Sequence, residues 1–171
     1  MMKRSDFEIM APVGSYDSLT AAIQGGADSV YFGIEGLNMR ARSSNNFTID
    51  DLHEIVRICN EHRIKSYLTV NTVIYDEDIP LLHRIIDAAK EAGLSAIIAS
   101  DVAAMTYARE IGVEVHLSTQ LNISNTEALR FYARFADVVV LARELNMEQV
   151  AVFTKPFCGI VSWGRAENRY V

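Results

Sequence analysis

One pattern recurs six times along this sequence and constrains its fold more than any other feature. A short run rich in apolar residues ends in polar residues, and a stretch with helical periodicity follows. Because nearly every position in these runs is apolar, they are typical of parallel strands that are covered on both faces. The six predicted strands are residues 7–11, 29–32, 66–70, 96–99, 114–117 and 137–141.

The stretches between the runs carry the periodicity of amphipathic helices, in which apolar residues recur three and four positions apart. Ser124 with Glu127, and Asn146 with Gln149, have the spacing of a capping box, so we expect Ser124 and Asn146 to begin helices. The two clearest apolar stripes are Leu52, Ile55, Val56 and Cys59, and Ile79, Leu82, Ile86 and Ala89.

Alternating strands and helices leave two main architectures, an open doubly wound sheet or a (β/α)8 barrel. A complete barrel takes about 250 residues and eight units. This chain has 171 residues and six units, and residues 154–171 are too few for two more. The sequence therefore predicts either an open sheet or an incomplete barrel.

Charge and hydropathy exclude several classes of protein. The chain has 16 Lys and Arg against 22 Asp and Glu, a net charge of -6, which argues against coating nucleic acid by charge alone. The longest apolar run, residues 138–142, is far shorter than the roughly 20 residues of a membrane span. Lys3 and Arg4 precede no apolar run, so we expect no signal peptide. With two cysteines outside any CxxC pattern, the sequence predicts a cytoplasmic protein without membrane contact.

Polar residues follow nearly every predicted strand, and in both architectures the active site lies at the carboxyl ends of the strands. Ser15, Ser100 and Asp101 fit an alternative role as helix caps. That role explains less well the polar run that begins at Ser118, or an Arg–Glu pair directly after an apolar strand. The strand-end residues that we predict to bind substrate are Asn71, Gln120, Asn122, Arg143 and Glu144.

Two arginines, Arg40 and Arg42, lie in the one long connection of the chain, residues 33–47. Alternate residues of an extended segment point the same way. With Arg143 they would form a pocket for an anionic small molecule, because guanidinium donates paired hydrogen bonds to carboxylate and phosphate. The alternative is a pair of solvated loop arginines.

His116 is the one histidine in a predicted strand, two residues before Ser118. Their proximity suggests activation of a serine nucleophile, so both are candidate catalytic residues. The alternative is a histidine satisfied in the barrel interior, since no third orienting group has a recognisable spacing. The sequence contains no HExxH, no clustered His and Cys, no P-loop and no GxGxxG, so we expect no metal or dinucleotide site.

Seven motifs follow one another in order between residues 7 and 150. They are Met-Ala-Pro-Val-Gly-Ser15, Gly-Gly-Ala-Asp-Ser-Val-Tyr-Phe-Gly33, Asn-Met-Arg-Ala-Arg42 with Asn-Phe-Thr48, Tyr-Leu-Thr-Val-Asn-Thr72, Ala-Ile-Ile-Ala-Ser-Asp101, His-Leu-Ser-Thr-Gln-Leu-Asn122 and Val-Leu-Ala-Arg-Glu-Leu145. Together these motifs closely resemble the peptidase U32 family, the collagenase-like proteases.

The resemblance implies an eight-unit barrel, and hence an α/β fold with an incomplete (β/α)8 TIM-like barrel of about six βα units here. We expect residues 7–153 to form the partial barrel and residues 154–171 a divergent tail. For the intact parent, the resemblance implies hydroxylation of a tRNA uridine with prephenate as donor; other members modify a ribosomal RNA cytidine. The alternative is a collagenase-like endopeptidase of unknown mechanism.

Several members of the family carry an iron–sulfur cluster on four cysteines after the sixth unit. This sequence has only Cys158 there, so we expect no cluster in this chain, because a cubane requires four ligands. The loss of resemblance after Val150 leads us to expect a truncated chain. RNA or peptide would bind through the intact parent, and the open sheet edges favour self-association. A third hypothesis is a non-catalytic fragment.

Overall fold

A computed structural model describes residue 4 and residues 7–34, 37 and 47–155 of the chain. Strands and helices alternate, as the repeated pattern predicts, and short 3₁₀ turns lie at Asp76–Asp78 and Thr119–Leu121. The other elements are β1 (Met10–Pro12), α1 (Tyr16–Gln24), β2 (Ser29–Phe32), α2 (Ile49–Glu61), β3 (Lys65–Val70), α3 (Ile79–Ala92), β4 (Ala96–Ala99), α4 (Val102–Ile111), β5 (Val115–Leu117), α5 (Thr126–Tyr132), β6 (Val138–Val139) and α6 (Met147–Thr154).

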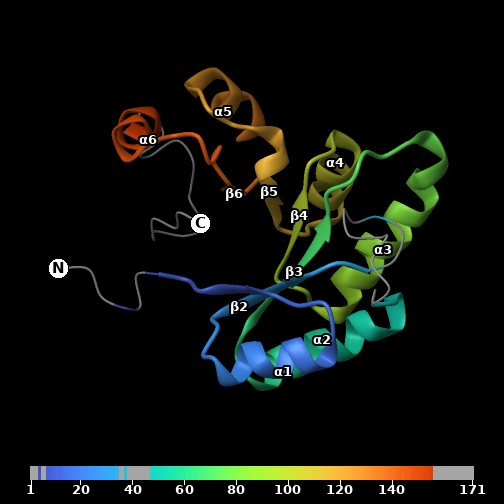
Figure 1. Cartoon of the computed structure of the whole chain (residues 1–171). Coiled ribbons are helices and arrows are strands. Elements are labelled where there is room, and N and C mark those ends of the chain that lie inside the picture. The colour runs from blue at the N-terminus through green and yellow to red at the C-terminus, as the bar shows by residue number, and fades with distance from the viewer. Residues whose placement is uncertain (1–3, 5–6, 35–36, 38–46, 156–171) are drawn as a thin grey trace.

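All six strands are parallel and pair in chain order, from β1 at one edge to β6 at the other. A doubly wound sheet reverses its strand order near the middle, so the continuous order decides between the two architectures. Right-handed crossovers then place every helix on the same side of the sheet. Figure 1 shows the helices following one another around the outside of a curved sheet. The fold is therefore the predicted incomplete barrel, a curled half-barrel of six βα units.

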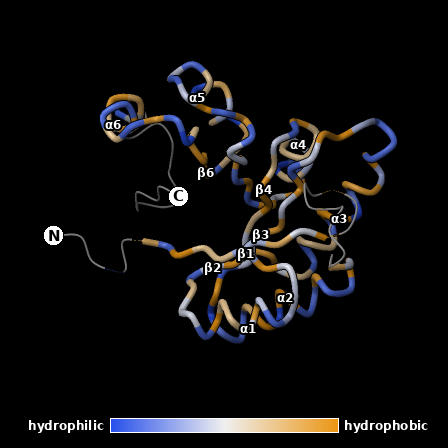
Figure 2. Tube along the Cα trace, viewed as in Figure 1, coloured by the Kyte–Doolittle hydropathy of each residue, from blue (hydrophilic) through white to orange (hydrophobic). Residues whose placement is uncertain are grey.

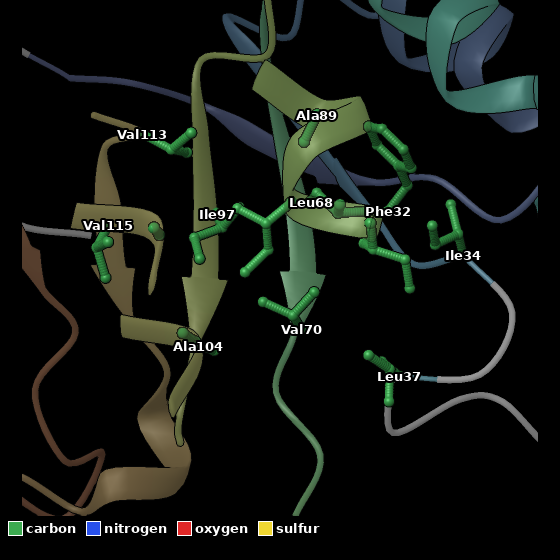
Figure 3. Close-up of a cluster of buried hydrophobic side chains, with 14 of the residues drawn as sticks. Phe32, Ile34, Leu37, Leu68, Val70, Ala89, Ile97, Ala104, Val113 and Val115 are labelled. Carbon is green, nitrogen blue, oxygen red and sulfur yellow. The ribbon is translucent and has the colours of Figure 1, made fainter. Parts of the chain in front are cut away.

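The helix-covered face of the sheet forms the hydrophobic core. Leu68, Ile97 and Val115 come from neighbouring strands, are paired in register and are fully buried. Figure 3 shows these three side chains in a row, and Figure 2 shows apolar residues along the strands that carry them. The helices contribute the predicted stripes, of which the fully buried members are Leu52, Ile55, Val56 and Cys59 in α2 and Leu82, Ile86 and Ala89 in α3.

The opposite, concave face of the sheet is more polar. Successive residues of a strand point to opposite faces, so Tyr67, Thr69 and His116 lie on the side away from the helices. Tyr67 and His116 come from β3 and β5, and their ring centroids are 4.8 Å apart across β4. Alternate strands of a barrel contribute to the same interior layer, which is the relation these two rings have.

Three predicted strands are shorter in the structure: β5 begins one residue later than predicted, at Val115, and the two edge strands lose more. Residues 7–9 precede β1, where Asp28 and Ser29 both donate backbone hydrogen bonds to the carbonyl of Ile9. At the other edge, β6 contains only Val138 and Val139, because the chain leaves the sheet and Ala142 donates its N–H to the carbonyl of Ile123. The bounds predicted for β2 and β4 are confirmed.

Most predicted helix starts are confirmed, and one is wrong. Asn146 and Gln149 form the predicted capping box, and Ser15 and Asp101 cap α1 and α4. Helix α5 begins one residue later than predicted, since the side chain of Asn125, not Ser124, accepts a hydrogen bond from the backbone N–H of Ala128. No helix in the described part of the chain has the length and apolar character needed to cross a membrane.

Candidate functional site

The ends of β3 and β5 meet at the carboxyl edge of the sheet. Asn71 directly follows β3, and its Nδ2 donates to Oγ of Ser118, which directly follows β5, over 3.5 Å. Ser118 is only 4% exposed, and its backbone N–H donates to the carbonyl of Ala99 in β4. The contact spans 47 positions of sequence and brings together two residues that we predicted for the site.

The 3₁₀ turn after β5 explains part of the polar run that begins at Ser118. Oγ of Ser118 caps this turn by accepting a hydrogen bond from the backbone N–H of Gln120 over 3.4 Å. Asn122 ends the turn in the left-handed conformation, with φ of 48°, which asparagine adopts more readily than most residues. The side chains of Gln120 and Asn122 are exposed at this edge, where they remain available to a ligand.

Arg143 and Glu144 lie in a turn that follows β6. The hydrogen bond from Ala142 to Ile123 places this turn beside the loop that carries Asn122. Both side chains are exposed, and neither forms an ion pair among the described residues. Arg40 and Arg42 lie outside the described residues, so the predicted arginine pocket stays a prediction.

His116 is buried on the concave face and is hydrogen-bonded to a residue that the sequence analysis missed. Its Nε2 lies 2.9 Å from Oε1 of Glu114, two residues earlier in the chain. Within the described part of the chain, no hydrogen bond joins His116 to Ser118. The signal that could have revealed Glu114 is its spacing, because Glu114, His116 and Ser118 alternate along one strand and so share a face.

A second polar cluster was also missed by the sequence analysis. The hydroxyl of Tyr67 donates to Oε1 of Glu8 over 2.6 Å, and Nζ of Lys65 donates to Oε2 over 2.8 Å. Burial, and then the hydrogen bond to Glu8, raise the pKa of Tyr67, so its hydroxyl keeps its proton. The polar residues Lys65, Tyr67 and Thr69 alternate along β3, which indicated a polar face but not the distant partner Glu8.

The described residues do not fit an iron–sulfur cluster, which requires four ligands, usually thiolates. Among these residues, no three His, Cys, Asp or Glu side chains gather in a way that would hold a metal ion. Cys59 lies in α2, and burial raises its pKa to about 11, so it is a protonated part of the core. Cys158 lies outside the described residues.

Comparisons with known proteins agree with this fold. The model of the family described as peptidase family U32 matches residues 14–159. A "Collagenase" of Porphyromonas gingivalis is 78% identical over 149 residues, which are 87% of this chain and 36% of that protein. The "tRNA hydroxylation protein P1" of Bacillus subtilis is 34% identical over 146 residues, 84% of this chain and 34% of that protein.

A solved structure, that of the U32 peptidase Mk0906, superposes with a TM-score of 0.72 at 14% identity, over 87% of this chain and 64% of that one. At this identity the likeness concerns the fold alone. The chain spans about a third of the length of the curated relatives it matches.

Proposed function

The chain belongs to peptidase family U32, and from that premise we propose that the intact protein hydroxylates a tRNA uridine, with prephenate as donor. Relatives named for tRNA hydroxylation match 84% of this chain or more. Because the chain spans about a third of those proteins, the activity is proposed for the whole protein and not for these residues alone. A tRNA substrate also implies a cytoplasmic protein.

The Asn71–Ser118 contact is the observation that carries this proposal. It gathers an amide and a hydroxyl at the carboxyl edge, with the exposed amides of Gln120 and Asn122 beside them. Amide and hydroxyl groups both donate and accept hydrogen bonds. They complement the edge of an unstacked uracil, which presents carbonyl oxygens and an N–H group.

Arg143 supports the part of the proposal that concerns the second substrate, prephenate. Prephenate carries two carboxylates, and an exposed guanidinium without an ion pair among the described residues offers the paired donors that a carboxylate accepts. Arg40 and Arg42 are proposed to join it. The negative net charge of the chain does not oppose this role, because sequence-specific RNA contacts are local.

Mass spectrometry of tRNA nucleosides tests the proposal in the source cell. We expect hydroxyuridine to disappear in a deletion strain, to return with the intact parent protein and to stay absent with Ser118→Ala or Arg143→Ala. The matched control is Arg84→Ala, which removes an exposed arginine from α3, away from the carboxyl edge. An unchanged hydroxyuridine level in the deletion strain would sink the idea.

A peptidase is the second candidate, favoured by 78% identity to a protein named collagenase. In the described part of the structure His116 forms no hydrogen bond with Ser118, since Nε2 of His116 is directed at Glu114 and Oγ of Ser118 accepts from Asn71 and Gln120. Gelatin cleavage by the purified intact protein tests this candidate. Cleavage that is lost in both Ser118→Ala and His116→Ala would favour it over RNA modification.

A further inference from the structure

The strand β5 and its flanking residues carry three polar side chains on the concave face, Glu114, His116 and Ser118. Ring atom Nε2 of His116 lies 2.9 Å from Oε1 of Glu114. An ionised carboxylate can only accept hydrogen bonds, so Nε2 must carry the hydrogen. In the neutral ring, the proton-accepting nitrogen is then Nδ1, and no hydrogen bond within the described residues occupies it.

The other groups around His116 leave this assignment intact. From β3, the ring of Tyr67 contacts the imidazole, but its hydroxyl donates to Glu8. Glu8, from the segment before β1, also accepts from Lys65, so both charges of that ion pair are engaged with each other. The residues that pair with His116 from β4 and β6 are apolar, Ile98 and Val138.

We propose that Glu114 is a positioning residue that holds His116 in the Nε2–H form, so that Nδ1 accepts a proton from a ligand bound at the carboxyl edge. This inference rests on the proposed function, in which the ligand is the donor or the uridine. Two residues of strand separate His116 from Ser118, about 7 Å along the concave face, which is within reach of a small molecule.

The proton balance of this step is simple. An O–H or N–H group of the ligand gives its proton to Nδ1, and the ligand keeps the electron pair. The imidazolium that forms donates through Nε2–H to the carboxylate of Glu114, which stabilises the new positive charge. An aspartate or glutamate that orients a histidine in this way also fixes its tautomer.

The tautomer can be measured without any assay of the reaction. Long-range ¹H–¹⁵N correlation spectra of the ¹⁵N-labelled intact protein at pH 8 should show His116 protonated at Nε2 and bare at Nδ1. In Glu114→Gln this preference should fall toward a mixture, because the glutamine amide both donates and accepts. Glu110→Gln, the same change at an exposed position of α4, is the control and should leave the spectrum unchanged.

Activity measurements then distinguish a positioning role of Glu114 from a purely structural role. We expect Glu114→Gln to lower kcat about a hundredfold with little change in KM, the range of a general base. His116→Gln should lower kcat at least as much as Glu114→Gln while keeping the melting temperature. A wild-type His116 protonated at Nδ1, or a His116→Gln protein with full activity, overturns the inference. A deletion strain that keeps its hydroxyuridine refutes the proposed function only, since the tautomer result still decides the role of Glu114.

Discussion

The two faces of the sheet hold their side chains by different forces. On the helix-covered face, Leu68 and Ile97 pack in the hydrophobic core without a directional contact. On the concave face, Tyr67 and His116 are each fixed by a hydrogen bond to a carboxylate. Apolar burial is non-directional and proportional to area, whereas a hydrogen bond fixes distance and angle.

This difference separates stability from chemistry within one small sheet. The helix-covered face buries Leu68, Ile97 and Val115 completely, and burial of apolar surface is the main favourable contribution to folding. The concave face aims specific atoms at specific places, which a binding site requires. Substitutions at four positions test how far this separation holds.

The largest effect is expected on the helix-covered face. Leu68 is fully buried in the centre of the core, and Leu68→Ala should lower the free energy of unfolding by about 3 kcal/mol, because it leaves a cavity. Urea denaturation measures this loss. Val73→Ala, at a position 69% exposed after β3, is the control. A loss below about 1 kcal/mol for Leu68→Ala would contradict the placement of the core on this face.

A smaller loss is expected from the concave face. Tyr67→Phe removes the hydroxyl that donates to Glu8, a carboxylate only 11% exposed, and should cost about 2 kcal/mol, as for a hydrogen bond to a charged group. The matched control is Tyr107→Phe, which removes a similar bond to Asp87 on the helix surface and should cost less. Equal losses in the two variants would show that burial of the Tyr67–Glu8 pair adds nothing.

At the rim of the concave face, Asn122 allows the effect of backbone conformation to be measured separately from the effect of the side chain. Asn122 has φ of 48°, so Asn122→Ala should cost about 1 kcal/mol through strain, while Asn122→Gly should not. Thermal unfolding measures both. If Asn122→Gly folds like the parent but loses tRNA modification, the side chain acts in the site; full modification would assign Asn122 to the turn alone.

The smallest effect concerns pH. A hydrogen bond from the backbone of Ile9, and then one from Arg4, lower the pKa of Asp28, which anchors the segment that carries Glu8. A carboxyl with a lowered folded pKa stabilises the protein above its unfolded pKa, and this contribution disappears as pH falls through the folded pKa.

Asp28→Asn should therefore lower stability at pH 7 and flatten its decline at acid pH. Because the Asp28 side chain is 40% exposed, solvent screening keeps the effect below about 1 kcal/mol. Chemical denaturation between pH 2 and 7 measures it, with Asp50→Asn as the control for loss of one surface charge. If the stability of Asp28→Asn falls with decreasing pH as steeply as that of the parent, the segment before β1 is held by its backbone alone.

Local patterns in the sequence were sufficient for much of the fold. The stripe of Leu52 and Ile55 predicted the buried face of α2, and the apolar runs predicted β2 and β4 with their bounds. The error at Ser124 has a local cause, since serine and asparagine both cap helices well and the two residues are adjacent. Asn125, with its extended backbone, is the one that directly precedes the helix.

The candidate site was predicted less completely. Asn71, Ser118 and His116 were selected by their position at or near strand ends, without knowledge of their partners. Glu8 was missed because its bond to Tyr67 joins residues 59 positions apart, and no local pattern encodes such a contact. Glu114 is only two residues from His116, so the sequence shows that they share a face of the strand. Several other polar residues in this chain have similar spacing, so the spacing alone did not identify Glu114.

By itself, the sequence determined that this chain forms six parallel strand–helix units, because apolar period and turn residues act over a few neighbouring positions. Periodicity alone left an open sheet and a barrel both possible, and the family resemblance implied the barrel. The tertiary structure shows that the strands follow in chain order around a curve, and it alone decided that Asn71 meets Ser118 and Tyr67 meets Glu8. The physical reason is that a period of two residues fixes the face on which a side chain lies. Which strands become neighbours, and how strongly the sheet curls, depends on the packing of the helices against the whole sheet.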